Sequence, residues 1–289
     1  MILIVECGAT KSDWTLLDRG VVHKSFQTEG LNFSSGDEEF IARTLEYGVL
    51  TSRDAADSAC LDAIYFYAAG LFPSDDPSSP YNILYGCLSR NFPDSKIYLE
   101  NDLLAAARAV CGHDAGIACI LGTGSNVSVY DGVTIVSRIP SGGFILGDEG
   151  SAGALGKRFI EDYIKGMVPE CVALAFEEKY DLSYSTIVRN VYHGNSPAAY
   201  LGKFAPDILA FYDDNRYMSN LVDENFRRFI ERCLLLAIHR SQGPLHLGVV
   251  GGFAYACRRI FDRLAGEYDL HVDKYLASPS EELIKFHQK

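Results

Sequence analysis

The sequence lacks a long hydrophobic run, an excess of basic residues and a paired cysteine motif. No apolar stretch approaches the roughly 20 residues that a membrane-spanning helix needs. The 26 basic and 38 acidic residues give a formal charge of −12. This balance argues against a general binder of nucleic acid or anionic membranes, because neutralising phosphates requires clustered Lys and Arg. It is compatible with a local pocket for a phosphorylated small molecule.

The eight cysteines are scattered, and none belongs to a CxxC pair. Secreted disulfide scaffolds are smaller and denser in cysteine, so we expect reduced thiols and a cytoplasmic location. The opening segment, Met1–Glu6, is too short for the apolar core of a signal peptide and lacks a basic stretch. With 289 residues, of which 48% are hydrophobic and 22% charged, the composition indicates a globular protein of two domains.

A three-strand pattern with a glycine turn occupies residues 2–26 and recurs over residues 117–139. The turn glycines Gly8 and Gly122 are 114 residues apart, and the aspartates that open the second turns are 113 apart. Two meanders matched in this way indicate a duplicated domain, the alternative being a coincidence of two ordinary hairpins.

The rest of the chain alternates between strands and helices, which predicts the α/β class. Residues 73–80, rich in Pro and Ser, are expected to form a surface loop. We expect helices at 37–47, 81–92, 103–110, 151–165, 170–180, 219–241 and from 253 to about 264, and strands at 63–69, 97–99 and 245–250.

The two glycine turns are candidate phosphate sites. The segments Gly8–Ser12 and Gly122–Asn126 both contain hydroxyl side chains, and exposed backbone N–H groups beside glycine form a concavity that suits an anion. Most glycine-rich turns are only turns, so both interpretations stay open. Neither a P-loop nor a GxGxxG motif follows the first strand. Any phosphate would therefore be held by hairpins and not by a loop that opens a helix.

Two acidic segments precede predicted helices. Asp102 follows a short strand, where it is either the N-cap of the next helix or a general base at the strand end. The segment Asp148–Ser151 could cap a helix or bind sugar hydroxyls. The residues alone do not decide between these alternatives.

Together these segments resemble the N-acetylglucosamine kinase branch of the sugar kinase, heat-shock chaperone and actin superfamily, grouped with the activator ATPases of benzoyl-CoA reductase (the BadF/BadG/BcrA/BcrD type). The run Leu146–Ser151 is the most specific match, whereas the two hairpins are superfamily-wide. In family order, the matching segments are Ile4–Ser12, Gly30–Asn32, Glu100–Asp102, Leu121–Asn126, Gly143–Ser151, Ser196–Pro206 and Val249–Gly252.

The resemblance implies two ribonuclease-H-like (actin-like ATPase) domains around a nucleotide cleft. The first would comprise residues 1–111, joined by a C-terminal helix at about 279–289, and the second residues 112–278. Mg-ATP and a sugar would be the ligands, with a homodimer as the expected assembly and no nucleic-acid or membrane partner. Apolar positions on the 219–241 helix could support such a dimer.

The resemblance also implies roles for individual residues. Asp102 would be the catalytic base that accepts the proton of the sugar's 6-hydroxyl, and Glu6 would orient Mg²⁺ through water. The phosphates of ATP would be bound by Gly8, Ala9, Thr10, Lys11, Gly122, Thr123 and Gly124, the rest of the nucleotide by Gly251 and Gly252, and the sugar by Asn32, Ser125, Gly143 and Asp148.

Three positions depart from the family pattern. Glu6 replaces the usual Asp, and its extra methylene would move the carboxylate by about an ångström, enough to lower rates about 100-fold. The alternative is that a small shift of the ion, which keeps several waters, accommodates the longer side chain. Cys7 replaces a small residue. Gly142 stands where many relatives carry a Trp against the sugar, and Phe144 is a candidate for that apolar wall.

The function that the resemblance implies is ATP-dependent phosphorylation of an amino sugar at its 6-hydroxyl, with N-acetylglucosamine as the first choice. One alternative is an ATPase activator of a radical dehydratase or reductase, whose bridging iron–sulfur cluster would need cysteines such as Cys111 and Cys119. Another is a weakly catalytic sugar or nucleotide sensor.

Overall fold

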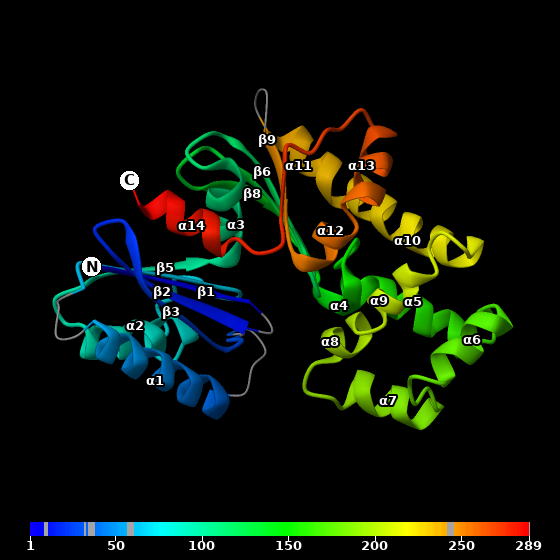
Figure 1. Cartoon of the computed structure of the whole chain (residues 1–289), viewed down its shortest axis with the longest axis horizontal. Helices are drawn as coiled ribbons and strands as arrows, with labels where there is room; N and C mark the ends of the chain where they lie inside the picture. The colour runs from blue at the N-terminus through cyan, green and yellow to red at the C-terminus, as the bar shows by residue number, and fades with distance from the viewer. Residues whose placement is uncertain (9–10, 32, 34–37, 57–60, 242–245, 289) are drawn as a thin grey trace. The chain divides into compact units, whose positions relative to one another are not determined.

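The chain is divided into two compact units (Figure 1). This computed structural model describes residues 1–8, 11–31, 33, 38–56, 61–241 and 246–288. Unit 1 comprises Met1–His113 and Pro279–Lys289, and unit 2 comprises Asp114–Ser278. Each unit contains one mixed five-stranded sheet with helices. The predicted α/β class with two domains is therefore confirmed.

The sheet of unit 1 has the strand order β3-β2-β1-β4-β5, with antiparallel pairing among the first three strands and parallel pairing of β1, β4 and β5. Helices α1 and α2 cover one face, and α3 with the returning α14 cover the other (Figure 1). The elements are β1 (Ile2–Cys7), β2 (Lys11–Asp18), β3 (Val21–Glu29), α1 (Glu38–Ala55), β4 (Ala63–Ala68), α2 (Pro80–Asn91), β5 (Lys96–Asn101), α3 (Asp102–Cys111) and α14 (Ser280–His287).

The sheet of unit 2 has the order β10-β9-β6-β7-β8. Its elements are β6 (Gly116–Leu121), β7 (Ser125–Tyr130), β8 (Ile135–Ile139), α4 (Gly143–Leu146), α5 (Ala152–Tyr163), α6 (Glu170–Glu177), α7 (Tyr184–Tyr192), α8 (Pro197–Gly202), α9 (Ala205–Ala210), α10 (Arg216–Phe229), a π-helical turn (Ile230–Leu234), α11 (Leu235–Arg240), β9 (His246–Val250), α12 (Gly252–Ala256), α13 (Arg258–Gly266) and β10 (Lys274–Leu276).

The two sheets repeat one topology, with β1, β2, β3, β4 and β5 corresponding to β6, β7, β8, β9 and β10. Both meanders even carry a register shift at matching places, Leu16–Leu17 and Val129–Tyr130, which are 113 residues apart. The first hairpin pairs Cys7 with Ser12 and the second pairs Leu121 with Ser125. The first turn is therefore one residue longer, which explains why the separation changes from 114 to 113 along the repeat.

Several sequence predictions need correction in unit 2. The helix expected at 219–241 is three consecutive pieces, because a π-helical turn interrupts it. Its apolar positions, among them Phe226 and Phe229, are buried in the unit's own core and do not form a free face for a dimer. The short elements α4, α7, α8, α9 and β10 were not predicted.

All seven cysteines among the described residues are free thiols, and most are buried. In the same ranges, no helix combines the length and the apolar character that crossing a bilayer requires.

Gly48 is a closely packed position in unit 1, where a substitution would test the packing of the core. It lies on α1 against Trp14, which is fully buried, stacks on Phe26 and donates from Nε1 to Thr28 at 3.0 Å. A Cβ at Gly48 would lie 2.2 Å from the Trp14 ring. We expect Gly48→Ala to lower the free energy of unfolding by about 1–3 kcal/mol, as overpacking does.

Urea unfolding measures this loss. Gly86→Ala in α2 is the matched control, because its Cβ would meet nothing within 4 Å. That change should leave stability equal or raise it by up to about 1 kcal/mol, since Ala is the better helix former. Equal stability of the wild type and Gly48→Ala would contradict the packing described for Trp14.

Candidate active site

Three carboxylates gather at one end of the sheet in unit 1. Glu6 is the second-to-last residue of β1 and pairs across the strands with Asp13 on β2, and Asp102 opens α3. Burial, and then the charges of Asp13 and Asp102, raise the pKa of Glu6 to about 7. Compared with a solvated Glu, the raised pKa favours the protonated form of the Glu6 carboxyl.

Asp102 is the first residue of α3, and it does not cap the helix. Asn101 is the N-cap, because its side-chain oxygen accepts the N–H of Leu104 at 2.9 Å. The N-cap interpretation of Asp102 is therefore wrong. Burial raises the pKa of the Asp102 carboxyl, and backbone N–H groups of Leu103 and Asp102 partly oppose that shift. A carboxyl with a raised pKa at a helix start has the properties of a proton acceptor.

Asp13, the neighbour of Glu6, contacts several polar side chains through its carboxylate. Lys11 Nζ lies 3.1 Å from Asp13 Oδ2, Gln27 donates to Oδ1 at 2.6 Å, and Ser280 Oγ donates to Oδ2 at 2.8 Å. Ser280 also hydrogen-bonds Glu6. It belongs to α14, so the segment that returns from unit 2 completes the polar end of the unit 1 sheet.

In the part of the chain that the structure describes, the carboxyl groups of Asp13 and Asp102 and the ammonium of Lys11 all act on Glu6, so negative charge predominates there. Such hard oxygen donors suit Mg²⁺. Among the described residues, no three His, Cys, Asp or Glu side chains are close enough to ligate one ion together. The donor set therefore fits an ion that keeps water or substrate oxygens as most of its ligands, which is usual for Mg²⁺.

In the first glycine turn, the N–H of Gly8 donates to the carbonyl of Lys11 at 2.9 Å. Lys11, for which we predicted a phosphate contact, is paired with Asp13. Ala9, Thr10 and Asn32, which the resemblance assigns to phosphate and sugar, lie outside the described residues.

The second glycine turn, Gly122–Gly124, is bonded to the start of α5. The carbonyls of Gly122 and Thr123 accept N–H groups of Ala152 and Gly153 at 2.9 and 3.0 Å. Within the described part of the chain, the N–H groups of Thr123 and Gly124 donate no hydrogen bond. Fixed carbonyls and unused donors are the features that an anion-binding turn requires.

Asp148 lies against this turn. Its carboxylate accepts the N–H of Ser125 at 3.3 Å, and a Cβ at Gly124 would come within 3.1 Å of its Oδ2. Burial raises the pKa of this carboxyl, and only 8% of the residue is exposed. Ser151, and not Asp148, caps α5 by accepting the N–H of Ala154 at 3.0 Å. Asp148 is therefore available for another partner.

Gly251 brings the end of β9 next to the same turn. Its φ is +134°, and a Cβ there would lie 2.2 Å from the carbonyl oxygen of Leu121, so only glycine fits. Gly252 follows at the start of α12, where an added Cβ would meet nothing within 4 Å. Unit 2 thus places Gly122–Gly124, Ser125, Asp148 and Gly251 together.

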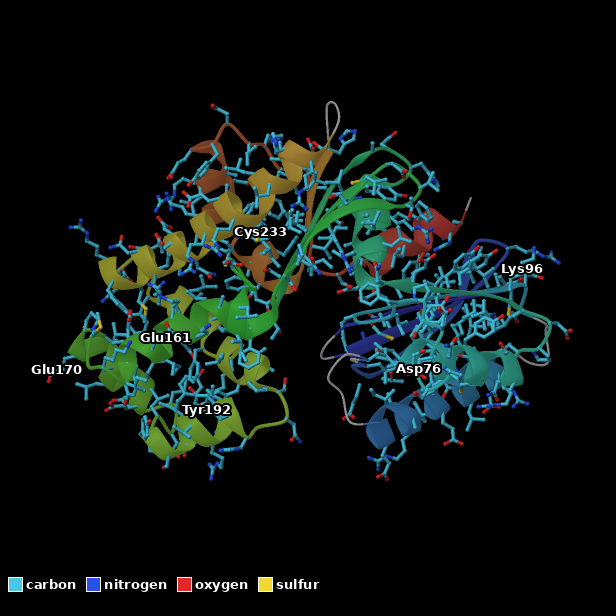
Figure 2. All side chains as sticks on the ribbon, turned by 180° about the vertical axis from the view of Figure 1, so that it is seen from behind. Asp76, Lys96, Glu161, Glu170, Tyr192 and Cys233 are labelled. Carbon is cyan, nitrogen blue, oxygen red and sulfur yellow. The ribbon has the colours of Figure 1, made fainter. Side chains whose placement is uncertain are left out.

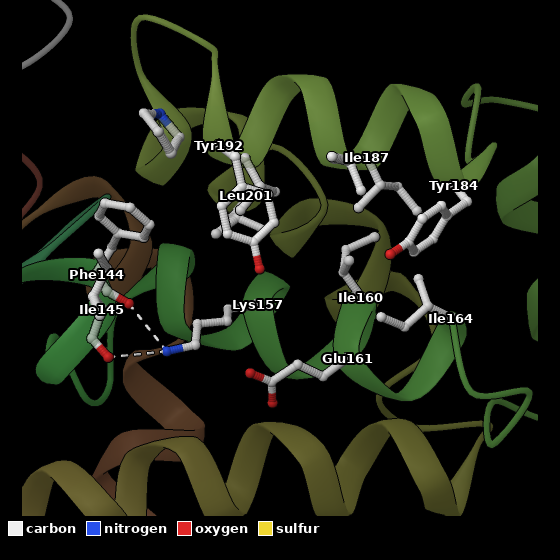
Figure 3. A pocket seen from close by; sticks show the side chains of 13 residues that line it. Phe144, Ile145, Lys157, Ile160, Glu161, Ile164, Tyr184, Ile187, Tyr192 and Leu201 are labelled. Atoms are coloured by element: carbon white, nitrogen blue, oxygen red, sulfur yellow. Dashed lines mark hydrogen bonds between the residues drawn. The ribbon is translucent and has the colours of Figure 1, made fainter.

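Gly143 opens the short helix α4, whose first turn is closed by the N–H of Gly147 bonding the Gly143 carbonyl at 2.8 Å. Lys157 on α5 holds this helix by donating to the carbonyls of Phe144 and Ile145 at 3.1 and 3.3 Å (Figure 3). Phe144 and Ile145 also line a mostly apolar cavity of about 470 Å³ between α4, α5, α7 and α8 (Figure 3). Phe144 therefore faces this cavity and packs against the core of unit 2.

Sequence reasoning missed Asp13, Ser280 and the residues that support Asp148. Asp13 could have been found, because antiparallel pairing across a tight turn places it opposite Glu6. Ser280 had no comparable signal, since it is 267 residues from the Asp13 that it contacts.

Comparisons with known proteins give structural relatives only. No protein-family model and no curated protein sequence matches the chain. A structure described as a putative N-acetylglucosamine kinase from Porphyromonas gingivalis is 36% identical, with a TM-score of 0.89 over 100% of this chain and 99% of its own. A second protein so described, from Chromobacterium violaceum, is 17% identical, with a TM-score of 0.73 over 99% and 98% of the two chains.

A more distant relative is a ROK family glucokinase from Streptomyces griseus, solved with glucose and AMPPNP. It is 18% identical, with a TM-score of 0.57 over 99% of this chain and 97% of its own. Like the Chromobacterium protein, it shows the shared two-domain fold. The identity to the Porphyromonas protein over essentially both whole chains shows more, namely that the chain belongs to the N-acetylglucosamine kinase-like family that this protein represents, within the actin-like ATPase fold.

Proposed function

We propose that the protein transfers the γ-phosphoryl group of ATP to the 6-hydroxyl of an amino sugar, with N-acetylglucosamine as the first candidate, giving the sugar 6-phosphate and ADP. The observation that carries this proposal is the state of Asp102. Its carboxyl has a raised pKa, and it does not cap α3 because Asn101 is the N-cap. The relative that is 36% identical over the whole chain, described as a putative kinase of this sugar, supports the choice of substrate.

In this proposal Asp102 accepts the proton of the sugar hydroxyl as that oxygen attacks the γ-phosphorus. The bond from this phosphorus to the bridging oxygen of ADP breaks in the same step. Because charge is spread over the equatorial phosphate oxygens, the enzyme acts mainly by positioning and charge neutralisation. The phosphates would be bound by the unused N–H donors of Thr123 and Gly124, together with the Gly8 turn and Lys11. The rest of the nucleotide would be bound by Gly251 and Gly252.

Mg²⁺, when bound with ATP, would neutralise phosphate charge, and Glu6 would hold it through water. Asp148, Ser125 and Gly143 would bind the sugar, with Asn32 added by resemblance. Asp148 suits this role because its buried carboxylate has only the Ser125 N–H as a hydrogen-bond partner among the described residues.

An acceptor screen tests the proposed function. The full-length protein with Mg-ATP would be offered N-acetylglucosamine, glucosamine, N-acetylmuramic acid and glucose, while ADP release and the sugar phosphate are both measured. We expect the highest kcat/KM with N-acetylglucosamine and one sugar phosphate formed per ADP. Sugar-independent ADP release would contradict sugar phosphorylation, and sugar binding without ADP release would favour a sensor.

The alternative of an iron–sulfur activator ATPase is not favoured by the cysteines. Cys111 ends α3 in unit 1 and is 7% exposed, and Cys119 lies fully buried in β6 of unit 2. A cluster bridging two subunits needs accessible thiolates. The same purified protein should therefore be colourless and free of iron.

A further inference from the structure

The turn that carries Asp148 is held in a strained shape. Asp148 has a φ of +56° and Gly150 a φ of +79°. The left-handed region is uncommon for a residue other than glycine and persists only where the surroundings impose it. Backbone bonds from Asp148 N–H to Ser141 and from Ser151 N–H to Asp148 support the turn from one side, at 3.0 and 3.1 Å.

The other support comes from α10 and its π-helical turn. Asn225, which is 6% exposed, accepts the N–H of Gly150 at 3.3 Å and donates to the carbonyl of Ser151 at 3.1 Å. Both groups of this buried amide are thus used on the backbone of the turn. An amide with both ends satisfied in this way specifies one conformation of its partner.

Glu149 fastens the turn to the same helix. Arg232 Nε lies 2.6 Å from Glu149 Oε1, and the Cys233 thiol donates to Oε2 at 3.9 Å. Burial and the Glu149 carboxylate raise the pKa of Cys233 to about 11, so it stays protonated as a donor. Cys233 lies among the helices of unit 2 (Figure 2).

The π-helical turn explains how one helix makes all of these contacts. Each residue of an α-helix turns by about 100° around the helix axis, so side chains four residues apart point in directions that differ by about 40°. A π-turn bonds i to i+5 and is wider, so Cys233 returns toward the face that carries Asn225 and Phe229. Phe229 packs beneath the turn, where a Cβ on Gly150 would lie 2.6 Å from the Phe229 Cβ.

We propose that Asn225, together with the Glu149–Arg232 pair, is a positioning element that holds Asp148 in the geometry that binds the sugar. Neither Asn225 nor Arg232 is predicted to touch substrate, and both would act through the turn. The inference rests on the proposed sugar kinase function for its kinetic consequence, but its structural part can be measured without any substrate.

The kinetic test compares Asn225→Ala and Arg232→Gln with the wild type. Removing Asn225 should raise the KM for the sugar about tenfold, roughly the loss of one buried hydrogen-bonded contact, while the KM for ATP changes less than about twofold. Arg232→Gln should have a smaller effect, about threefold, because its side chain is 61% exposed. Arg232→Lys should recover most of it, since the charge is kept.

Arg227→Gln is the matched control on the same helix. Its guanidinium pairs with Glu267 at 3.1 Å and does not reach the turn, so its sugar KM should equal that of the wild type. Two kinetic results would overturn the inference. One is a folded Asn225→Ala protein with an unchanged sugar KM, and the other is an equal rise of the KM values for sugar and ATP.

Amide hydrogen exchange of the substrate-free protein tests the structural part. The N–H of Gly150, which donates to Asn225, should exchange at least about tenfold faster in Asn225→Ala and remain unchanged in Arg227→Gln. If the wild type phosphorylates none of the sugars, the proposed function is wrong, and exchange alone then decides the positioning role. Unchanged protection of Gly150 in Asn225→Ala would overturn that role as well.

Discussion

Asp102→Asn is expected to reduce sugar phosphorylation by about 10²- to 10⁴-fold, the range that a positioned general base contributes. An amide keeps the size of the side chain, but it cannot accept the proton of the 6-hydroxyl. The KM for ATP should change little, because Asp102 is not assigned to the nucleotide. A coupled ADP assay at saturating sugar measures the loss.

The surface variant Asp94→Asn, which makes the same chemical change on an exposed residue before β5, should keep full activity. The wild-type rate should fall toward acid pH as Asp102 becomes protonated, at a pH above the usual range for Asp, because burial raises its pKa. Turnover by Asp102→Asn above about a tenth of the wild-type rate would remove Asp102 from its role.

Glu6→Gln is expected to make the protein more stable and a poorer catalyst. A freely solvated Glu side chain has a pKa of 4.5, whereas the pKa of Glu6 in the folded protein is about 7. Below pH 4.5 both the folded and the unfolded chain hold the proton, and folding is unaffected. As the pH rises from 4.5 to 7 the unfolded chain releases this proton while the folded protein keeps it, so stability falls, and the full loss of about 3 kcal/mol is present at pH 8.

The neutral amide avoids that cost, so urea unfolding without Mg²⁺ should show Glu6→Gln more stable than the wild type at pH 8 and nearly equal at pH 4.5. Glu29→Gln, the same change on an exposed residue, is the control and should keep stability within about 0.5 kcal/mol of the wild type. Equal stability of the Glu6 variant and wild type at both pH values would contradict the raised pKa.

Activity should move in the opposite direction, falling about 100-fold in Glu6→Gln because the water-mediated contact to Mg²⁺ loses its charge. Mg-ATP should in turn stabilise the wild type more than Glu6→Gln, since the cation lowers the pKa of Glu6. Glu6→Asp should preserve or raise activity. A large loss in that variant would show that the rest of the site is adapted to the longer side chain.

The hairpins and the duplication could be predicted because their information is local. Glycine turns such as Gly8 and Gly122, flanked by apolar runs, specify strand ends within a few residues. The helices over 184–210 did carry start signals, Ser183 as a cap and Pro197 in the first turn. They are short, however, and α8 packs closely on α5, where a Cβ at Gly156 would lie 1.9 Å from the Leu201 carbonyl. Tertiary contacts of this kind leave no periodic pattern.

The residues of the candidate site could be predicted from the sequence, but the hydrogen bonds and ion pairs between them could not. Asn101 and Asp102 are both good helix caps by type, and only the backbone geometry decides that Asn101 takes the role. The contact between Glu149 and Arg232 spans 83 residues, and it depends on a π-helical turn that apolar spacing does not indicate.

Unit 1 is discontinuous along the chain, since α14 follows the whole of unit 2 and packs on α3. On the ribosome, the amino-terminal sheet must therefore wait for the 165 residues of Asp114–Ser278 to be translated before its last helix arrives. At about 5–20 residues per second this delay lasts on the order of ten seconds. During that interval the part of the apolar sheet face that Leu283 will cover stays exposed beside α3, so the nascent chain should bind chaperones until α14 has emerged.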